Sequence, residues 1–137
     1  MTFDFTPDQH ALAQKTRDVA ASIGDGVAHV IDTLGSVPDD VSKLLKAQSL
    51  RHVFEHGLTS ALIVIEELAT VSAGLAAHVG FDAAAGGERK TVIPHAWPGL
   101  RSAEVPLAAV EVGSAETRAK GRLAAAAVSL GIGRAAV

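Results

Sequence analysis

The chain contains no cysteine, which excludes a disulfide framework and any metal site built on thiolates. Acidic residues, Asp4 and Asp8, stand where a signal peptide would be basic. The longest apolar run, residues 61–65, is interrupted by Glu66 and Glu67 and is far too short to cross a bilayer. We therefore expect a soluble, cytoplasmic protein with no membrane-spanning segment.

Tyrosine is also absent, and four phenylalanines and one tryptophan are the only aromatic residues among 137. A core must then be built from aliphatic and small side chains, and the length suits a single domain. The formal net charge of −3 gives no electrostatic reason to expect binding to nucleic acid or to an anionic membrane.

Helix start signals are clear near the N-terminus. Thr6 is a candidate N-cap, Pro7 occupies the first helical position, and Gln9 can complete a capping box. The residues that recur behind it on one helical face are Leu12, Thr16, Val19 and Ile23. Two glycines weaken this helix, which we expect to resume until Gly35. Residues 36–39 start a further helix with a buried stripe of Val41, Leu44 and Leu45.

The clearest helical pattern covers residues 59–79. Its apolar seam consists of Leu62, Ile65, Ala69, Ser72, Ala76 and Val79. A helix this apolar is typically central and contacted on several sides. Glu66 and Glu67 within it diverge by about 100°. We expect one to face solvent, and Glu66, beside the seam, to be the more buried, with a raised pKa. A solvated or paired carboxylate is the plainer interpretation.

The second half of the chain has a different composition. Residues 82–87 predict a loop, and two β-branched runs, 91–93 and 110–112, predict short extended segments. Ser114 then caps a last helix, whose expected apolar positions are Leu123, Ala127, Leu130 and Val137. Ala127 with Gly131 would let another backbone approach closely. The fold is therefore predicted to be mainly α, a single domain of three or four helices with a short irregular β segment.

Five segments also resemble one known family in their order along the chain. They are residues 3–9 (FDFTPDQ), 37–45 (VP with LL), 65–80 (IEELA, GL and HVG), 99–112 (GLRS and VEV) and 122–136 (RLA and LGIGRAA). Together they resemble the acyl-CoA dehydrogenase family and touch most of the chain. The resemblance implies an acyl-CoA dehydrogenase-like helical bundle. Residues 1–81 are similar to the family's N-terminal domain, 82–113 to a remnant of its middle β-domain, and 114–137 to the start of its C-terminal helical domain.

The departures from the family bear on chemistry. Most of the flavin-contacting middle domain is missing between about Gly80 and Gly99, and three of four C-terminal helices are absent with the usual catalytic glutamate. Gly121 occupies the position at which some members carry that base. The family's reaction needs both a flavin and a carboxylate base. We therefore expect no cofactor on the chain alone, FAD only with a partner subunit, and no autonomous dehydrogenase activity.

Two functions follow as hypotheses. The first is an acyl-CoA dehydrogenase-like protein that binds an apolar acyl or polycyclic ligand, with isomerisation, dehydration or cyclisation as a redox-neutral option. Its candidate acid–base groups are Glu66 and His78. The resemblance places Leu75, Ala76, Val79 and Gly80 at the acyl pocket, although helix packing explains them equally well. The second function is that of an accessory subunit of a full-length FAD-dependent acyl-CoA dehydrogenase.

A metal site is the weakest alternative. His52, Glu55 and His56 fit the H-x-x-E-H pattern of one zinc-peptidase class, and on an α-helix the two histidines would share a face. No third ligand stands out, so surface histidines at a helix end are the preferred interpretation and no metal is expected.

Partners are expected at the last helix. In the family this helix belongs to a four-helix bundle that forms subunit contacts, whereas here it has an apolar, alanine-rich face and no bundle. Exposing such a face is unfavourable. We therefore predict a homo-oligomer, with a dimer favoured, or a hetero-oligomer with a larger relative, with this helix and the chain end in the interface.

Overall fold

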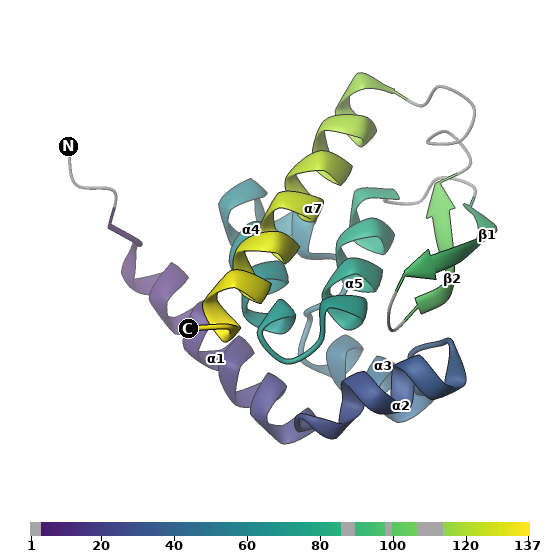
Figure 1. Ribbon diagram of the computed structural model, residues 1–137. Coiled ribbons are helices and arrows are strands. Elements are labelled where there is room, and N and C mark those ends of the chain that lie inside the picture. The colour runs from purple at the N-terminus through teal and green to yellow at the C-terminus, as the bar shows by residue number, and fades with distance from the viewer. Residues whose placement is uncertain (1–3, 86–89, 98–99, 107–113) are drawn as a thin grey trace.

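The computed structural model describes residues 4–85, 90–97, 100–106 and 114–137, and the fold of these residues is mainly helical, as expected. The elements in chain order are α1 (Pro7–Ile23), α2 (Gly26–Leu34), α3 (Asp39–Ala47), the short 3₁₀ helix η1 (Val53–His56), α4 (Leu58–Ala69), α5 (Ala73–Ala85), β1 (Lys90–Trp97), β2 (Leu100–Pro106) and α7 (Ala115–Ala135). α4 and α5 lie in the middle, α7 packs on both, and α1 packs on α4 (Figure 1). None of the described helices is long and apolar enough to span a membrane.

The predicted start of α1 is confirmed. The Gln9 backbone N–H donates to Thr6 Oγ1 at 3.3 Å, and the Thr6 N–H donates to Gln9 Oε1 at 2.9 Å. This reciprocal capping satisfies amides that the first turn leaves without helical partners. The buried residues of α1 are Ala13, Thr16, Val19 and Ala20. The chain resumes as α2 and ends it at Gly35, whose φ of 72° is accessible to glycine without strain.

The prediction of a single helix over residues 59–79 is wrong, because these residues form two helices, α4 and α5. The cause is local. Thr70 Oγ1 donates to the Glu67 carbonyl oxygen at 2.7 Å, and Ser72 Oγ accepts from the Leu75 N–H at 3.2 Å. Short polar side chains that bond to the backbone in this way end one helix and cap the next. The turn lets α5 pack against α4.

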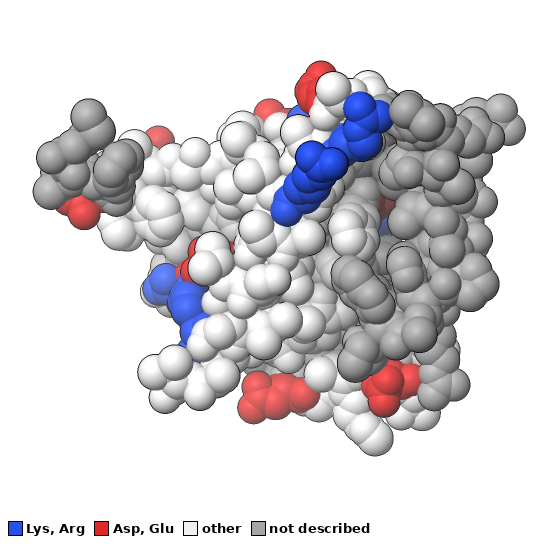
Figure 2. All heavy atoms as spheres, turned by 45° about the horizontal axis from the view of Figure 1, so that its top comes forward, with Lys and Arg blue, Asp and Glu red and all other residues white. Residues whose placement is uncertain are grey.

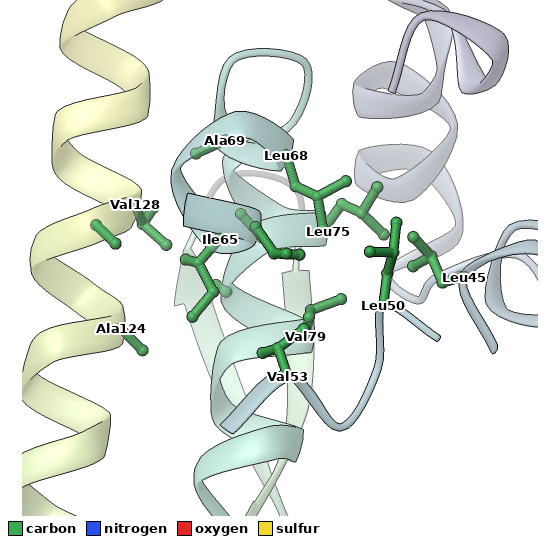
Figure 3. Close-up of a cluster of buried hydrophobic side chains, with 14 of the residues drawn as sticks. Leu45, Leu50, Val53, Ile65, Leu68, Ala69, Leu75, Val79, Ala124 and Val128 are labelled. Atoms are coloured by element: carbon green, nitrogen blue, oxygen red, sulfur yellow. The ribbon is translucent and has the colours of Figure 1, made fainter. Parts of the chain in front are cut away.

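The core is aliphatic, in keeping with the shortage of aromatic residues. Its largest fully buried side chains include Ile31, Leu45, Leu50, Val53, Ile65, Leu68, Leu75 and Val79. Figure 3 labels all of these side chains except Ile31 and shows them gathered between α4, α5 and the segment that leads from α3 to η1, with Ala124 and Val128 of α7 closing one side. The central position expected for the apolar segment of residues 59–79 is therefore confirmed, although that segment is two helices.

The expected extended segment at residues 91–93 lies in β1, which pairs antiparallel with β2. Lys90 faces Pro106 and Ile93 faces Ala103 in this hairpin. Two boundaries differ from expectation: residues 82–85, predicted as a loop, are the last turn of α5, and the predicted segment 110–112 lies outside the described residues.

The N-cap of α7 is confirmed, since Ser114 Oγ accepts from the Thr117 N–H at 3.1 Å. The predicted buried positions are wrong, except for Ala127. The buried residues of α7 are Thr117, Ala124, Ala127, Val128 and Gly131, whereas Leu130 is 62% exposed. The helix packs through its small residues because these allow a close approach to α4 and α5. The expectation that this helix lacks a partner within the chain is therefore wrong as well.

Candidate functional site

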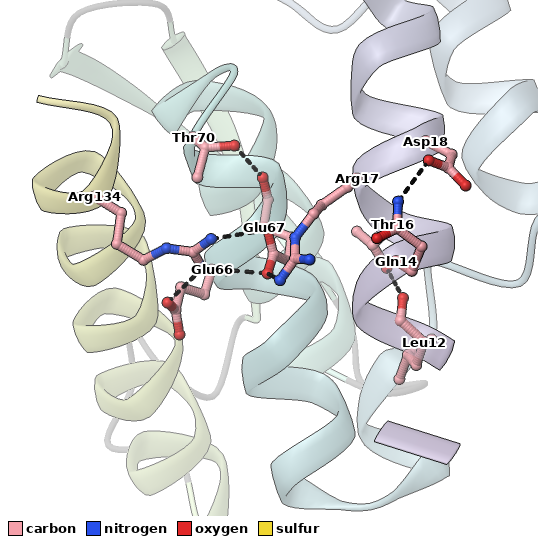
Figure 4. Close-up of polar contacts among 9 residues, drawn as sticks. All are labelled: Leu12, Gln14, Thr16, Arg17, Asp18, Glu66, Glu67, Thr70 and Arg134. Carbon is pink, nitrogen blue, oxygen red and sulfur yellow. Dashed lines mark hydrogen bonds and ion pairs between the residues drawn. The ribbon is translucent and has the colours of Figure 1, made fainter. Parts of the chain in front are cut away.

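Four charged side chains from three helices form a connected network of ion pairs (Figure 4). Arg17 of α1 places Nη2 2.8 Å from Glu67 Oε1 on α4. Arg134 of α7 lies 3.2 Å from the same oxygen and 2.7 Å from Glu66 Oε1. Two guanidiniums thus neutralise two carboxylates where α1, α4 and α7 meet.

The more buried carboxylate is Glu67, so the preference for Glu66 is wrong. The side chain of Glu67 is 5% exposed and that of Glu66 is 25% exposed. The reason is that α4 is oriented with Glu67 towards α1, where it pairs with Arg17. The apolar seam of residues 59–79 does not reveal that α1 lies there. Glu66 retains an ion pair with Arg134, so both carboxylates are used to hold helices together.

We expected the more buried glutamate to have a raised pKa, but the pKa of Glu67 is lowered. Burial by itself raises the pKa of Glu67, but the hydrogen bonds and charges of Arg17 and Arg134 outweigh it, and the pKa lies below its ordinary value. Glu67 is therefore ionised at neutral pH. A carboxylate with these partners is a poor proton acceptor, and the cluster is best described as structural.

The histidine pair proposed as a weak metal site has the wrong local structure. His52 precedes η1, and His56 is its last residue. A 3₁₀ helix has about three residues per turn, so residues four apart do not share a face as they would on an α-helix. His52, Glu55 and His56 are exposed. Within the described residues, no group of three or more potential ligands can hold a metal ion.

The residues placed at the acyl pocket by resemblance lie in the closed core of α5. Leu75 and Ala76 are fully buried, and Val79 is 1% exposed. A Cβ at Gly80 would lie 2.9 Å from the Ala124 Cβ, so no space for an acyl chain remains there. His78, on the same helix, is half-buried. The packing of α7 on α5 occupies the place that a ligand would need.

A hollow does exist on the other side of α4. It has a volume of about 220 Å³ and is half-enclosed, and we call it the inner hollow. Its lining residues are Leu12, Lys15, Gln48, Ser49, Leu50, Val53, His56, Ser60 and Val64. The surface inside is mostly apolar, and Leu50, Val53 and Val64 are almost completely buried. None of the four residues predicted for the acyl pocket lines it.

A hydrogen bond marks the rim of this hollow. Lys15 Nζ donates to the Gln48 carbonyl oxygen at 2.9 Å and so joins α1 to the end of α3. Beyond it lies a shallower and more polar depression, the outer hollow, lined by Ala11, Gln14, Lys15, Asp18, Val19, Ser22, Leu44 and Gln48. The two hollows share Lys15 and Gln48, so they adjoin at the ammonium group.

The wall formed by residues 48–53 is fixed by the backbone and by one ion pair. Ser49 has a φ of 59°, which turns the chain sharply after α3. The Leu50 N–H donates to the Leu45 carbonyl oxygen at 2.9 Å. Arg51 Nη2 then lies 3.0 Å from Asp82 Oδ2 of α5, whose side chain is 4% exposed. These contacts hold Leu50 and Val53 in place as walls.

Comparison with known proteins gives no independent assignment: no family model matches the chain, and no curated protein or solved structure matches it.

Proposed function

We propose that this chain is a small helical relative of the acyl-CoA dehydrogenases that binds an acyl group and carries no flavin of its own. The observation that supports binding is the inner hollow, with apolar walls and a lysine at its rim. The relationship is supported by the five segments in family order. The central position of α4, which carries the IEELA segment, is consistent with it.

The size of the hollow favours an acyl chain over a polycyclic group. Sites for drug-sized ligands have volumes of about 300–1,000 Å³, and the inner hollow has about 220 Å³. A short acyl chain, or the end of a longer one, fits this space, whereas a rigid polycycle needs more width. The apolar walls supply the hydrophobic free energy of binding.

Lys15 at the rim sets the orientation of the bound ligand. The Lys15 ammonium has three N–H donors, one of which is used by the Gln48 carbonyl. The others can bind a carboxylate or the carbonyl oxygen of a thioester at the mouth. The polar remainder of the ligand then lies over the outer hollow, which includes the polar side chains of Gln14 and Ser22.

We assign binding and no catalytic step to this site. Glu66 and His78, the candidate acid–base groups, line neither hollow. His56 lines the inner hollow, and its imidazole can donate or accept a hydrogen bond with a ligand there.

Closing the mouth tests the proposal. Ser60 is partly exposed on α4 and lines the inner hollow, whereas Thr59 is exposed and lines neither hollow. With octanoate as probe in isothermal titration calorimetry, we expect Ser60→Phe to weaken binding about tenfold or more, which corresponds to ~1.4 kcal/mol, because the phenyl ring occupies space that the ligand needs. Thr59→Phe, the matched control, leaves affinity unchanged.

The charge is tested separately. Lys15→Met keeps the apolar stem and removes the ammonium, so octanoate affinity should fall by about fivefold, as expected for a partly exposed ion pair. Affinity for the neutral probe octanol should not fall. Absence of saturable octanoate binding to the wild type, or equal binding by the Ser60 and Thr59 variants, contradicts the proposal.

A second candidate function is that of an accessory subunit of an FAD-dependent acyl-CoA dehydrogenase. The observation in its favour is the set of exposed apolar residues on α7, the helix that resembles a subunit-contact domain of the family. This function would be supported over independent ligand binding if the chain purifies in a complex with a larger relative and the complex absorbs at about 450 nm, as a bound flavin does.

A further inference from the structure

Lys15 lies where the two hollows meet. On α1, Leu12 lines the inner hollow, Asp18 lines the outer hollow, and Lys15 between them lines both. Lys15 Nζ donates to the Gln48 carbonyl oxygen at 2.9 Å, which holds the nitrogen at this border. The residue is exposed. An amino group is thus held at the mouth of an apolar space and remains accessible from solvent.

We propose that Lys15 is an acylation site, at which the ε-amino group takes the acyl group from a bound acyl thioester and the attached chain then fills the inner hollow. Acylation at this position rests on the proposed function, since the thioester must first bind with its chain in the inner hollow. Its carbonyl group then lies at the rim beside Nζ, and the thiol portion lies over the outer hollow. Holding two reacting groups together in this way makes their reaction faster than that of the same groups free in solution.

The transfer replaces a thioester by an amide. The Lys15 ammonium loses one proton to water, and the neutral amine attacks the thioester carbonyl carbon. The C–N bond forms and the C–S bond breaks. The departing thiolate takes a second proton from the nitrogen, so the products are an amide and a free thiol, and no oxidant or further reactant is needed. The step occurs once per chain and is not a catalytic cycle.

The Gln48 carbonyl oxygen can hold the nitrogen before and after the transfer. A neutral amine has two N–H donors and one lone pair, so Nζ can keep its bond to Gln48 while the lone pair attacks. The amide product retains one N–H, which can donate to the same oxygen. The attached chain then begins at the rim and lies against Leu50 and Val64, two apolar walls of the inner hollow. Acylation should therefore close the hollow to a free ligand.

Three other lysines whose side chains the structure describes provide the comparison. Lys43 and Lys46 are exposed on α3 and line neither hollow, and Lys120 is paired with Glu116 at 2.7 Å. On the face shown in Figure 2, the basic side chains of the described residues lie mainly in two separate groups on a largely uncharged surface. With a formal net charge of −3, the chain attracts polyanionic CoA only weakly. Selective acylation of Lys15 must then come from binding in the hollow.

Peptide mass spectrometry after incubation with octanoyl-CoA tests the assignment. We expect octanoylation of Lys15 to be at least about tenfold faster than that of Lys43 or Lys46. Acetyl-CoA has the same reactive group but no chain to fill the hollow, so with acetyl-CoA the advantage of Lys15 should disappear. This comparison uses the wild type alone and does not depend on the folding of any variant.

Three variants test whether the hollow directs the reaction. Ser60→Phe, which fills the hollow, should lower the octanoylation rate of Lys15 to that of Lys43, whereas Thr59→Phe should leave it unchanged. Lys15→Arg keeps the positive charge and should remove the fast phase of octanoyl incorporation. Circular dichroism checks that each variant is folded.

Isothermal titration calorimetry of the Lys15-octanoylated protein tests the occupied state. Octanoate affinity should fall by about 100-fold or more, because the attached chain occupies the site. Loss of the charge alone should cost only about fivefold, as expected for Lys15→Met. The two causes are therefore separable.

Equal octanoylation of Lys15, Lys43 and Lys46 would overturn the acylation site. So would the same preference for Lys15 with acetyl-CoA or in Ser60→Phe, or octanoylated protein whose octanoate affinity falls by only about fivefold. Acyl binding itself is contradicted by a different result, the absence of saturable octanoate binding to the unmodified wild type. Saturable octanoate binding with equal octanoylation of the lysines would contradict the acylation site alone.

Discussion

Replacing Gly131 by alanine is expected to lower the free energy of unfolding by about 1–3 kcal/mol, the usual cost of overpacking a closed contact. The added Cβ would lie 2.5 Å from the Ala69 Cβ and closer still to the Glu66 carbonyl oxygen. Backbone atoms of α4 cannot give way as a flexible side chain can. α7 must therefore shift away from α4, which loosens the contacts of Ala127 and Val128 with the core.

Gly121 provides the control within the same helix. A Cβ at Gly121 would meet nothing within 4 Å, so Gly121→Ala should raise stability by up to about 1 kcal/mol through helix propensity alone. Urea denaturation of both variants, with the slope of the transition checked for constancy, measures the difference. Equal effects of the two substitutions would show that α7 does not pack on α4 as described.

The second large effect is expected at Glu67. Glu67→Gln leaves two guanidiniums facing each other without the carboxylate between them. Removing one member of a buried ion pair costs about 3–5 kcal/mol. Because Arg17 and Arg134 are about half-exposed and can be hydrated, we expect a smaller loss of about 1–3 kcal/mol. Glu66→Gln, which removes a more exposed carboxylate, should cost at most about 1 kcal/mol.

The pH dependence identifies the carboxylate responsible. The pKa of Glu67 is lower in the folded protein than its ordinary value, so ionised Glu67 stabilises the fold above the pKa of the unfolded chain. That stabilisation is lost as the pH falls through the folded pKa. Urea denaturation between neutral and acidic pH should therefore show a steeper loss of stability in the wild type than in Glu67→Gln. Parallel curves would contradict this role.

Local signals predicted the starts of α1 and α7 well. The capping box of Thr6 and Gln9 and the Ser114 cap depend only on residues within one turn, so the sequence contains all the information needed. The close approach at Gly131 was also predictable, because a glycine opposite small residues has few other uses within a helix.

Long-range features were harder to predict. The break after Ala69 was missed because the apolar period continues through it, although Thr70 and Ser72 are a signal for a turn. Which of Glu66 and Glu67 is buried depends on where α1 lies. The orientation of α7 was misjudged because its large apolar residues suggested a buried face, whereas its small residues make the contacts.

The inner hollow could not be predicted from any one segment. Its walls come from α1, from the irregular chain before and through η1, and from α4, and no spacing rule relates these parts. Leu12 was expected on a buried face, but nothing indicated that Lys15 would cross to Gln48. The family resemblance directed attention to α5, where close packing with α7 fills the space.

The most direct test of acyl binding is to locate the ligand. Methyl-labelled protein is titrated with octanoyl-CoA and followed by two-dimensional NMR. We predict saturable shifts at Leu12, Leu50 and Val64 of the inner hollow, with little change at Leu75 and Val79 of α5. Shifts centred on Leu75 and Val79, or no saturable shift at any methyl group, would contradict the account.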